Sequence, residues 1–409
     1  MTIPWILGAP SERALREVAG RLRDLIAAGE VDPWDVGRTL ATTRPAHTHR
    51  AVLLGRGDDF AGPLDLLAHG RPGPHVVEGT AADVTRTAFV FPGQGAIWPG
   101  MAADLLDSAP VFARRIEDCA DALAPHVDWS LVDVLRSDAA DLYGRTDVVQ
   151  PVLFSIMVAL TELWRSYGVR PSAVVGHSIG EAAAACVAGA LSLDDAAKTA
   201  VLWSRAQSTL AGRGGMAVVA LPVDEVVSWF AEQGHDVDVS GVMAPRTVVV
   251  SGDSAVLELA AEQLRAAGVY AHVTSVPLAA HSPRVEEVRE IVLASLASIS
   301  PRASDLPFYS GMAGGLVDTA GLDARYWYRN LRQPMLFESA TRAMLADGYQ
   351  AFVEVGVHPV LTLALRQTAE AVGAVVPVLT SLRRDEQDLD HFLTSLADAH
   401  VQGVAVDWE

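Results

Sequence analysis

The stretch Val174-Val175-Gly176-His177-Ser178-Ile179-Gly180-Glu181 joins a short run of β-branched residues to an alanine-rich segment. This order predicts a strand, a sharp turn and a helix, with Ser178 at the tip of the turn. The flanking glycines tolerate the backbone strain and close packing that such a corner imposes. Ser178 would then stand exposed at the N-terminus of the helix, where backbone N–H groups can stabilise an oxyanion.

The pattern G-x-S-x-G is weak by itself, because a glycine-rich chain of this length matches it by chance roughly one time in ten. The alternative is a purely structural turn. The context favours a catalytic serine. Residues 171–175 have the pattern of a strand, and residues 181–190 have that of a buried helix whose small side chains pack closely on a sheet.

The composition is that of a large globular protein. The 409 residues leave room for about two or three domains, and no apolar run in the sequence approaches the length of a membrane span. The N-terminus lacks the pattern of a secretion signal, so we expect a cytoplasmic protein without membrane association. The net charge of −19 argues against nucleic acid as a partner. Both cysteines, Cys119 and Cys186, are expected to be small core residues.

The order of predicted elements divides the chain into four parts. Residues 1–85 form a small α+β unit, and the main α/β unit opens with a buried strand at 87–91. The segment 216–274 reads as β-α-β-β-α-β, which is the signature of a ferredoxin-like subdomain. We place the parts at 1–85, at 86–214 together with 276–385, at 215–275, and at 386–409.

A second glycine-rich loop, Pro92-Gly93-Gln94-Gly95, follows the strand at 87–91. Open α/β sheets bind ligands at the C-terminal ends of their strands, so this loop is a candidate ligand site. It is not a phosphate loop, because the lysine and the serine or threonine of that pattern are missing.

Five motifs occur in a fixed order along the chain: Phe89-Val-Phe-Pro-Gly-Gln-Gly95, Gly176-His-Ser-Ile-Gly-Glu181, Arg205, Ala280-His281-Ser282-Pro283 and Glu354-Val-Gly-Val-His-Pro-Val-Leu361. With them the chain resembles the acyltransferase family that loads malonyl-type units onto acyl carrier proteins, and in particular the acyltransferase domains of modular polyketide synthases. Residues 1–85 resemble the linker between a ketosynthase and its acyltransferase. Residues 327–334 and Asp407-Trp408 resemble the acyltransferase end and the tail that follows it. The resemblance implies an α/β-hydrolase-like large subdomain with an inserted ferredoxin-like small subdomain, preceded by a small α+β linker domain.

The resemblance assigns the catalytic roles residue by residue. Ser178 is the nucleophile and His281 the general base, which takes the serine proton and then protonates the leaving thiolate. A backbone carbonyl orients the His281 ring in this family, and the loop at Val357-His358 is our candidate for it. The backbone N–H groups of Gln94 and Ile179 form the oxyanion hole.

Arg205 is the residue from which we predict whether the acyl group has a second carboxylate. In a helix with an otherwise apolar face it would be a buried guanidinium, which is costly unless paired and suits bidentate binding of a carboxylate. The alternative is an internal salt bridge to a glutamate. If Arg205 holds substrate, the acyl group is malonyl or an alkylmalonyl, and acyl groups without a second carboxylate are selected against.

Four further residues are expected to line the acyl pocket. His177 either contacts the acyl carboxylate or is a satisfied histidine packed beside the turn. The family usually has His-Ala-Phe-His or Tyr-Ala-Ser-His where this chain has Leu278-Ala279-Ala280-His281. The smaller side chains predict a roomy pocket and an alkylmalonyl unit longer than methylmalonyl. Ile179 looks malonyl-like and the segment 146–151 looks methylmalonyl-like, so the specificity signals conflict.

The implied function is a two-step transfer in polyketide biosynthesis. Ser178 takes the acyl group from coenzyme A, and the phosphopantetheine thiol of an acyl carrier protein removes it. The expected partners are acyl-CoA, the carrier protein and an adjacent ketosynthase domain, and no metal or other cofactor is expected. Two alternatives stay open: an α/β serine hydrolase or thioesterase, which would need an acidic residue between Ser178 and His281 in the chain, and a catalytically silent docking module.

Overall fold

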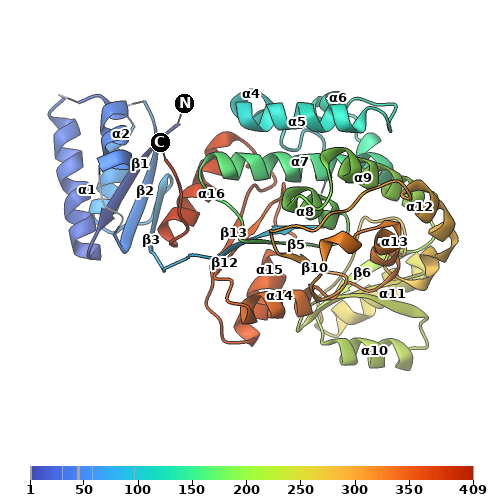
Figure 1. Cartoon of the computed structure of the whole chain (residues 1–409). Coiled ribbons are helices and arrows are strands. Elements are labelled where there is room, and N and C mark those ends of the chain that lie inside the picture. The colour runs from blue at the N-terminus through green and yellow to red at the C-terminus, as the bar shows by residue number, and fades with distance from the viewer. Residues whose placement is uncertain (1, 30, 44–46, 58, 96, 409) are drawn as a thin grey trace.

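The computed structural model describes residues 2–29, 31–43, 47–57, 59–95 and 97–408. Three separate sheets organise the chain (Figure 1): an antiparallel one near the N-terminus, a mostly parallel one in the centre, and an antiparallel one in the inserted segment.

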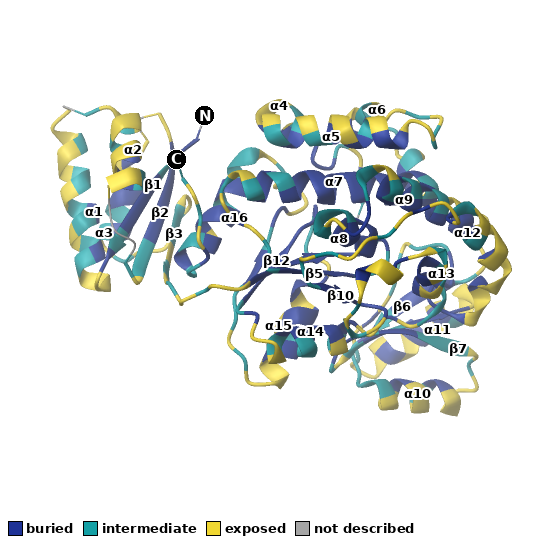
Figure 2. Cartoon of the chain, viewed as in Figure 1, coloured by how far each residue is buried: buried dark blue, intermediate teal, exposed yellow. Residues whose placement is uncertain are grey.

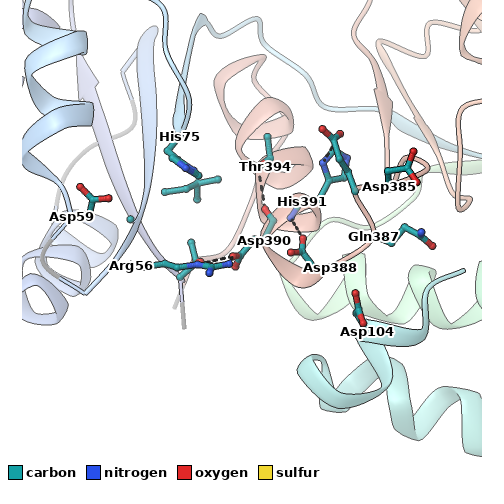
Figure 3. Close-up of a pocket in the computed structure, with 14 residues that line it drawn as sticks. Arg56, Asp59, His75, Asp104, Asp385, Gln387, Asp388, Asp390, His391 and Thr394 are labelled. Carbon is teal, nitrogen blue, oxygen red and sulfur yellow. Dashed lines mark hydrogen bonds and ion pairs between the residues drawn. The ribbon is translucent and has the colours of Figure 1, made fainter. Parts of the chain in front are cut away.

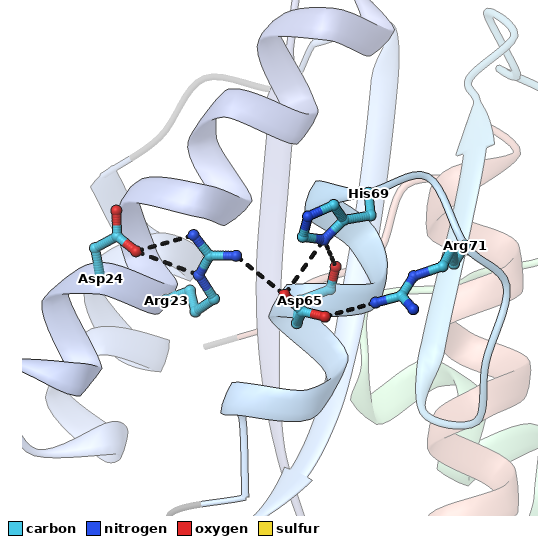
Figure 4. A network of polar contacts seen from close by, with 5 residues as sticks. All are labelled: Arg23, Asp24, Asp65, His69 and Arg71. Carbon is cyan, nitrogen blue, oxygen red and sulfur yellow. Dashed lines mark hydrogen bonds and ion pairs between the residues drawn. The ribbon is translucent and has the colours of Figure 1, made fainter.

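The N-terminal unit has a three-stranded sheet with helices on one side, which Figure 1 shows in blue. The Trp5 ring stacks on Phe60 with centroids 3.9 Å apart, and both side chains are fully buried. On the outer surface Asp65 accepts from Arg23 and Arg71 and joins the first and third helices (Figure 4). The elements are β1 (Thr2–Ala9), α1 (Glu12–Ala27), α2 (Pro33–Thr43), β2 (His49–Arg56), α3 (Ala61–Ala68) and β3 (Val76–Thr80).

The central sheet has the strand order β11-β10-β5-β4-β12-β13. Only β11 runs antiparallel to its neighbour. Parallel strands are covered on both faces, which explains why their sequences are apolar without alternation. The strands are β4 (Thr87–Phe91), β5 (Ala173–Gly176), β10 (Phe308–Ser310), β11 (Gly315–Leu316), β12 (Ala351–Glu354) and β13 (Val378–Thr380).

Helices cover both faces of this sheet (Figures 1 and 2). On one face are α4 (Ala103–Ser108), α5 (Pro110–Leu123), α6 (Leu131–Arg136), α7 (Thr146–Ser166), α8 (Gly180–Ala188), α9 (Leu193–Ser208) and α16 (Leu389–Val401); on the other are α14 (Phe337–Ala346) and α15 (Thr362–Ala371). Two further helices outside the inserted segment are α12 (Arg289–Ser295) and α13 (Ala324–Arg332), and the 3₁₀ turns are η1 (Leu142–Gly144), η2 (Pro283–Val288) and η3 (Thr319–Gly321).

The central helix α7 is long and apolar enough to cross a membrane by length and composition alone, which the sequence reading did not anticipate. In the fold 89% of its apolar window is buried against neighbouring elements, and Figure 2 shows it largely in the colour of buried residues. It is therefore a core helix of this domain.

The inserted segment folds as β-α-β-β-α-β around a sheet of order β7-β8-β6-β9. Its elements are β6 (Gly215–Val219), α10 (Val223–Glu232), β7 (Val237–Ala244), β8 (Thr247–Gly252), α11 (Ser254–Ala266) and β9 (Ala271–Val273). Met335 fastens it to the large subdomain, because its N–H donates to Ser240 and its carbonyl accepts from Val242, both at 2.8 Å. The predicted fold class, an α/β-hydrolase-like subdomain with a ferredoxin-like insertion and a small α+β unit before them, is confirmed.

Candidate active site

The structure brings Ser178 and His281 into contact across 103 residues of sequence. Ser178 follows β5 with a φ of 55°, the left-handed backbone of a serine at the tip of a tight turn. His281 Nε2 lies 3.1 Å from Ser178 Oγ, and Nδ1 lies 2.8 Å from the carbonyl oxygen of Asn330. A carbonyl only accepts, so Nδ1 carries the proton and Nε2 is left to accept from the serine hydroxyl.

Both predicted glycines of the turn are sterically required. A Cβ on Gly180 would lie 2.2 Å from the carbonyl oxygen of Phe91, and one on Gly176 would lie 2.4 Å from Glu181 Cα. The turn therefore presses against the C-terminal end of β4, where the loop at 92–95 begins. The two loops singled out from the sequence form one site.

The predicted orienting carbonyl is wrong. The carbonyl that holds His281 Nδ1 belongs to Asn330, near the end of α13, and not to Val357-His358. The last carbonyls of a helix have no partner within the helix, so α13 offers Asn330 O to the ring and Leu331 O to the His281 N–H. The His358 ring instead accepts from the Arg384 N–H and lies edge-on to Trp98.

The site keeps its imidazoles uncharged. Burial lowers the pKa of His281 to about 4, against the opposing effect of its hydrogen bond to Asn330. Burial, followed by the nearby His281, lowers the pKa of His177 to about 3. The rings of His177 and His281 are 6.2 Å apart. At neutral pH the His281 ring is therefore in its proton-accepting form.

Three glutamines connect the glycine-rich loop to the helices behind it. Gln150 Nε2 on α7 donates to Gln94 Oε1 at 3.0 Å, and Gln207 Nε2 on α9 donates to Gln150 Oε1 at 3.1 Å. Gln150 and Gln207 are buried, so each needs these partners. Gly93, which precedes Gln94, lies against the Ser178 turn, because an added Cβ there would be 2.6 Å from His177 Nδ1. The sequence reading missed Gln150 and Gln207, although an amide on the apolar face of α9 was a visible signal.

The placement predicted for Arg205 is also wrong. Arg205 is exposed on the outer face of α9 and donates to the carbonyl of His126. Residues four apart share a helix face, so Trp203 and Gln207 point inward and Arg205, between them, points away. Trp203 is buried and its Nε1 donates to the carbonyl of Trp327 at 3.0 Å. The partner of Arg205 in the structure is thus a backbone carbonyl, and the buried guanidinium expected from the sequence is not found at this position.

Comparison with known proteins settles the family. Residues 88–406 match the family model described as the acyl transferase domain. The chain belongs to this family. It is 49% identical over 412 residues to polyketide synthase GfsE of Streptomyces halstedii, and it spans only 11% of that protein's length.

Two solved acyltransferase structures are similar to this domain. The acyltransferase domain from module 8 of the salinomycin polyketide synthase superposes with a TM-score of 0.96 at 47% identity, covering 100% of this chain and 97% of that one. A loading acyltransferase from the avermectin modular polyketide synthase gives a TM-score of 0.73 at 47% identity, covering 76% of this chain and 98% of that one.

Three arginines of the segments around His281 are paired with carboxylates. Arg213 binds Glu287, Arg332 binds Glu286, and Arg284 binds Asp236. Over the described part of the acyltransferase, no group of three or more histidine, cysteine or acidic side chains could hold a metal ion.

The segment Leu278-Ala279-Ala280 is buried between the two subdomains of the acyltransferase. The Ser240 hydroxyl donates to the Ala280 carbonyl at 3.0 Å, and the backbone of Leu278 forms an isolated parallel β-bridge with that of Arg213. Ala279 lies against Gly214, where an added Cβ would be 3.2 Å from the alanine methyl. The three residues lead directly into His281, and none of them brings a charge or a polar side chain to it.

A cavity of about 540 Å³ lies elsewhere, between the N-terminal unit and α16 (Figure 3). Its lining is acidic, with Arg56 as its one arginine, and none of the predicted site residues reaches it; the acids are Asp59, Asp104, Asp385, Glu386, Asp388 and Asp390. Arg56 pairs with Asp390 and so ties β2 to α16. This cavity belongs to the junction between the units and not to the acyltransferase site.

Proposed function

We propose that the chain transfers an acyl group from coenzyme A to the phosphopantetheine thiol of an acyl carrier protein, through an ester on Ser178. The observation that carries this proposal is the 3.1 Å contact between Ser178 Oγ and a His281 ring held in its accepting tautomer by Asn330. Membership of the acyl transferase domain family supports it.

In the first step His281 Nε2 takes the proton of Ser178 while Oγ attacks the thioester carbonyl. The oxyanion is stabilised by the backbone N–H groups of Ile179 and Gln94. When the intermediate collapses, the C–S bond breaks and His281 returns the proton to the coenzyme A thiolate. In the second step His281 takes the proton of the carrier thiol, the sulfur attacks the ester, and Ser178 leaves with that proton.

The hydrolase alternative is not favoured. An α/β serine hydrolase orients its histidine with a carboxylate, whereas Nδ1 of His281 is bonded to a backbone carbonyl. A carbonyl fixes the tautomer without adding a negative charge beside the imidazolium that forms during the reaction.

We further propose that the acyl group has no free carboxylate. The malonyl or alkylmalonyl expectation depended on a buried guanidinium, and Arg205 lies outside the site. A second carboxylate would meet neutral imidazoles and amides there, and a buried carboxylate without a cation costs several kcal/mol. Trp203, on the inward face of α9, and Leu278, Ala279 and Ala280, which lead into His281, offer no charge to such a carboxylate. Such a unit cannot condense by losing CO₂, so it would serve as the first unit of a product, as the similarity to a loading acyltransferase also suggests.

Intact-mass spectrometry of the protein after incubation with single acyl-CoA donors tests both proposals. We expect acetyl-, propionyl- or isobutyryl-CoA to leave an adduct on Ser178 that a holo carrier protein discharges faster than water does, and Ser178→Ala to form none. A higher fraction of protein acylated by malonyl-, methylmalonyl- or hexylmalonyl-CoA than by these donors would overturn the assignment of the acyl group. Discharge by water as fast as by carrier protein would favour the hydrolase, and no adduct from any donor would refute the transfer.

A further inference from the structure

Glu181 is a buried carboxylate three residues after Ser178, in the first turn of α8. Its side chain is fully buried and accepts hydrogen bonds from the hydroxyl of Ser310, the backbone N–H of Met312 and the hydroxyl of Tyr326. The first two distances are both 3.0 Å. Ser310 and Met312 lie at the end of β10, so the carboxylate joins three segments that are far apart in the sequence.

The helix that supplies Tyr326 also orients the base. Tyr326 and Asn330 are four residues apart on α13 and therefore lie one above the other on the same helix face. The Asn330 carbonyl accepts from His281 Nδ1 at 2.8 Å. A continuous path thus runs from the Ser178 turn through Glu181 and Tyr326 to α13, and from α13 back to the imidazole.

Burying a carboxylate without a cation costs desolvation free energy, so a carboxylate that only joined two helices would be an unfavourable choice. Glu354 is a second buried carboxylate of the chain and can be compared with Glu181. It accepts hydrogen bonds from the N–H groups of Val360, Leu361 and Thr362 and from the Thr362 hydroxyl. All of these partners belong to one stretch at the start of α15, so Glu354 caps a single helix. Glu181 differs because it follows the nucleophile turn directly and its partners lie on two other elements, the end of β10 and α13, of which α13 orients His281.

We propose that Glu181 is a positioning residue, which acts through Tyr326 to hold the nucleophile turn and the base-orienting helix in register. The inference rests on the role proposed above for Ser178 and His281. Without this link the fold would persist, but α8 and α13 could shift relative to each other. A displacement of about 1 Å between reacting groups costs on the order of 100-fold in rate.

The test uses Glu181→Gln, Tyr326→Phe and the double variant, with Glu354→Gln as the matched buried-carboxylate control. We expect each single variant to lower the acylation rate at saturating acyl-CoA at least tenfold, with the half-saturating donor concentration unchanged. The double variant should lose no more than the worse single one, because both changes break the same link. Glu354→Gln should lower the denaturation midpoint while its folded fraction acylates within threefold of wild type.

Two results would overturn the proposal. One is a rate loss in Tyr326→Phe that follows only the loss of folded protein, and the other is a double variant whose losses multiply. The rate of Ser178 modification by phenylmethylsulfonyl fluoride provides a second readout that needs no acyl donor. If the wild type forms no ester with any acyl-CoA, the proposed function fails, and the sulfonyl fluoride rates still decide whether Glu181 and Tyr326 position the dyad.

Discussion

The substitution Gly180→Ala tests whether the contact between the Ser178 turn and the glycine-rich loop is required for acylation. The new methyl group would lie 2.2 Å from the Phe91 carbonyl oxygen and 2.4 Å from that of Pro92. An ordinary contact between these atoms is more than 3 Å, so one of the two loops must move by about 1 Å. We expect acylation to slow about 100-fold, because such a shift misaligns the reacting groups and displaces the Gln94 N–H that is proposed to stabilise the oxyanion. The overpacking should also cost about 1–3 kcal/mol in the free energy of unfolding.

Single-turnover acylation by an acyl-CoA, quenched and read by intact mass, measures the first effect, and denaturant unfolding measures the second. The matched control is Gly20→Ala in α1, where an added Cβ meets nothing within 4 Å. That change should stabilise the chain by about 0.5–1 kcal/mol and leave acylation unchanged. If Gly180→Ala acylates within threefold of wild type, the argument that close packing of these loops builds the site is refuted.

Three more predictions concern single side chains. Arg205→Ala should change the acylation rate less than twofold for every acyl-CoA donor in quenched single-turnover assays, because the side chain lies on the outer face of α9; selective loss of dicarboxylic donors would restore the sequence-based assignment. Gln207→Leu should leave Gln150 Oε1 without its donor, destabilise the chain by about 1–3 kcal/mol in denaturant unfolding and slow acylation about tenfold; unchanged values would show that the glutamine chain does not support the oxyanion loop. Burial raises the pKa of Glu181 from 4.5 to about 7, so the folded state binds this proton more tightly than the unfolded state. The ionised carboxylate therefore destabilises the fold above pH 7, and this destabilisation disappears as the pH falls to 4.5. The wild-type free energy of unfolding should therefore gain about 3 kcal/mol relative to Glu181→Gln between pH 7 and pH 4.5; a constant difference in unfolding experiments would contradict it.

The parts of the site that depend on neighbouring residues could be predicted from the sequence. A strand, a serine between two glycines and a helix of small residues are neighbours in the chain, so Ser178 and its turn could be predicted from the motif together with its flanking segments. His281 could be found only through the family resemblance, because nothing local connects it to a serine 103 residues away. The ferredoxin-like insertion could be predicted because its six elements follow one another without interruption.

The failures have physical reasons as well. The carbonyl of Asn330 is a main-chain group, and main-chain groups leave no mark in the sequence. Arg205 was misplaced because helix orientation depends on single-residue register: a shift of two positions, from 203 to 205, moves a side chain from the core to the solvent. The glutamine chain joins three elements whose packing is set by the tertiary fold, so the sequence shows the three amides without showing that they meet.

Both members of the dyad adopt left-handed backbone, with φ of 55° at Ser178 and 56° at His281. For residues with a Cβ this conformation costs roughly 1–2 kcal/mol each, and glycine avoids the cost. Glycine in place of Ser178 would therefore make the protein harder to unfold while abolishing its chemistry, whereas glycine in place of the buried His281 would leave a cavity that offsets the gain. A laboratory evolution campaign that selects only for heat tolerance would favour such inactive descendants, so every round must also be screened for turnover.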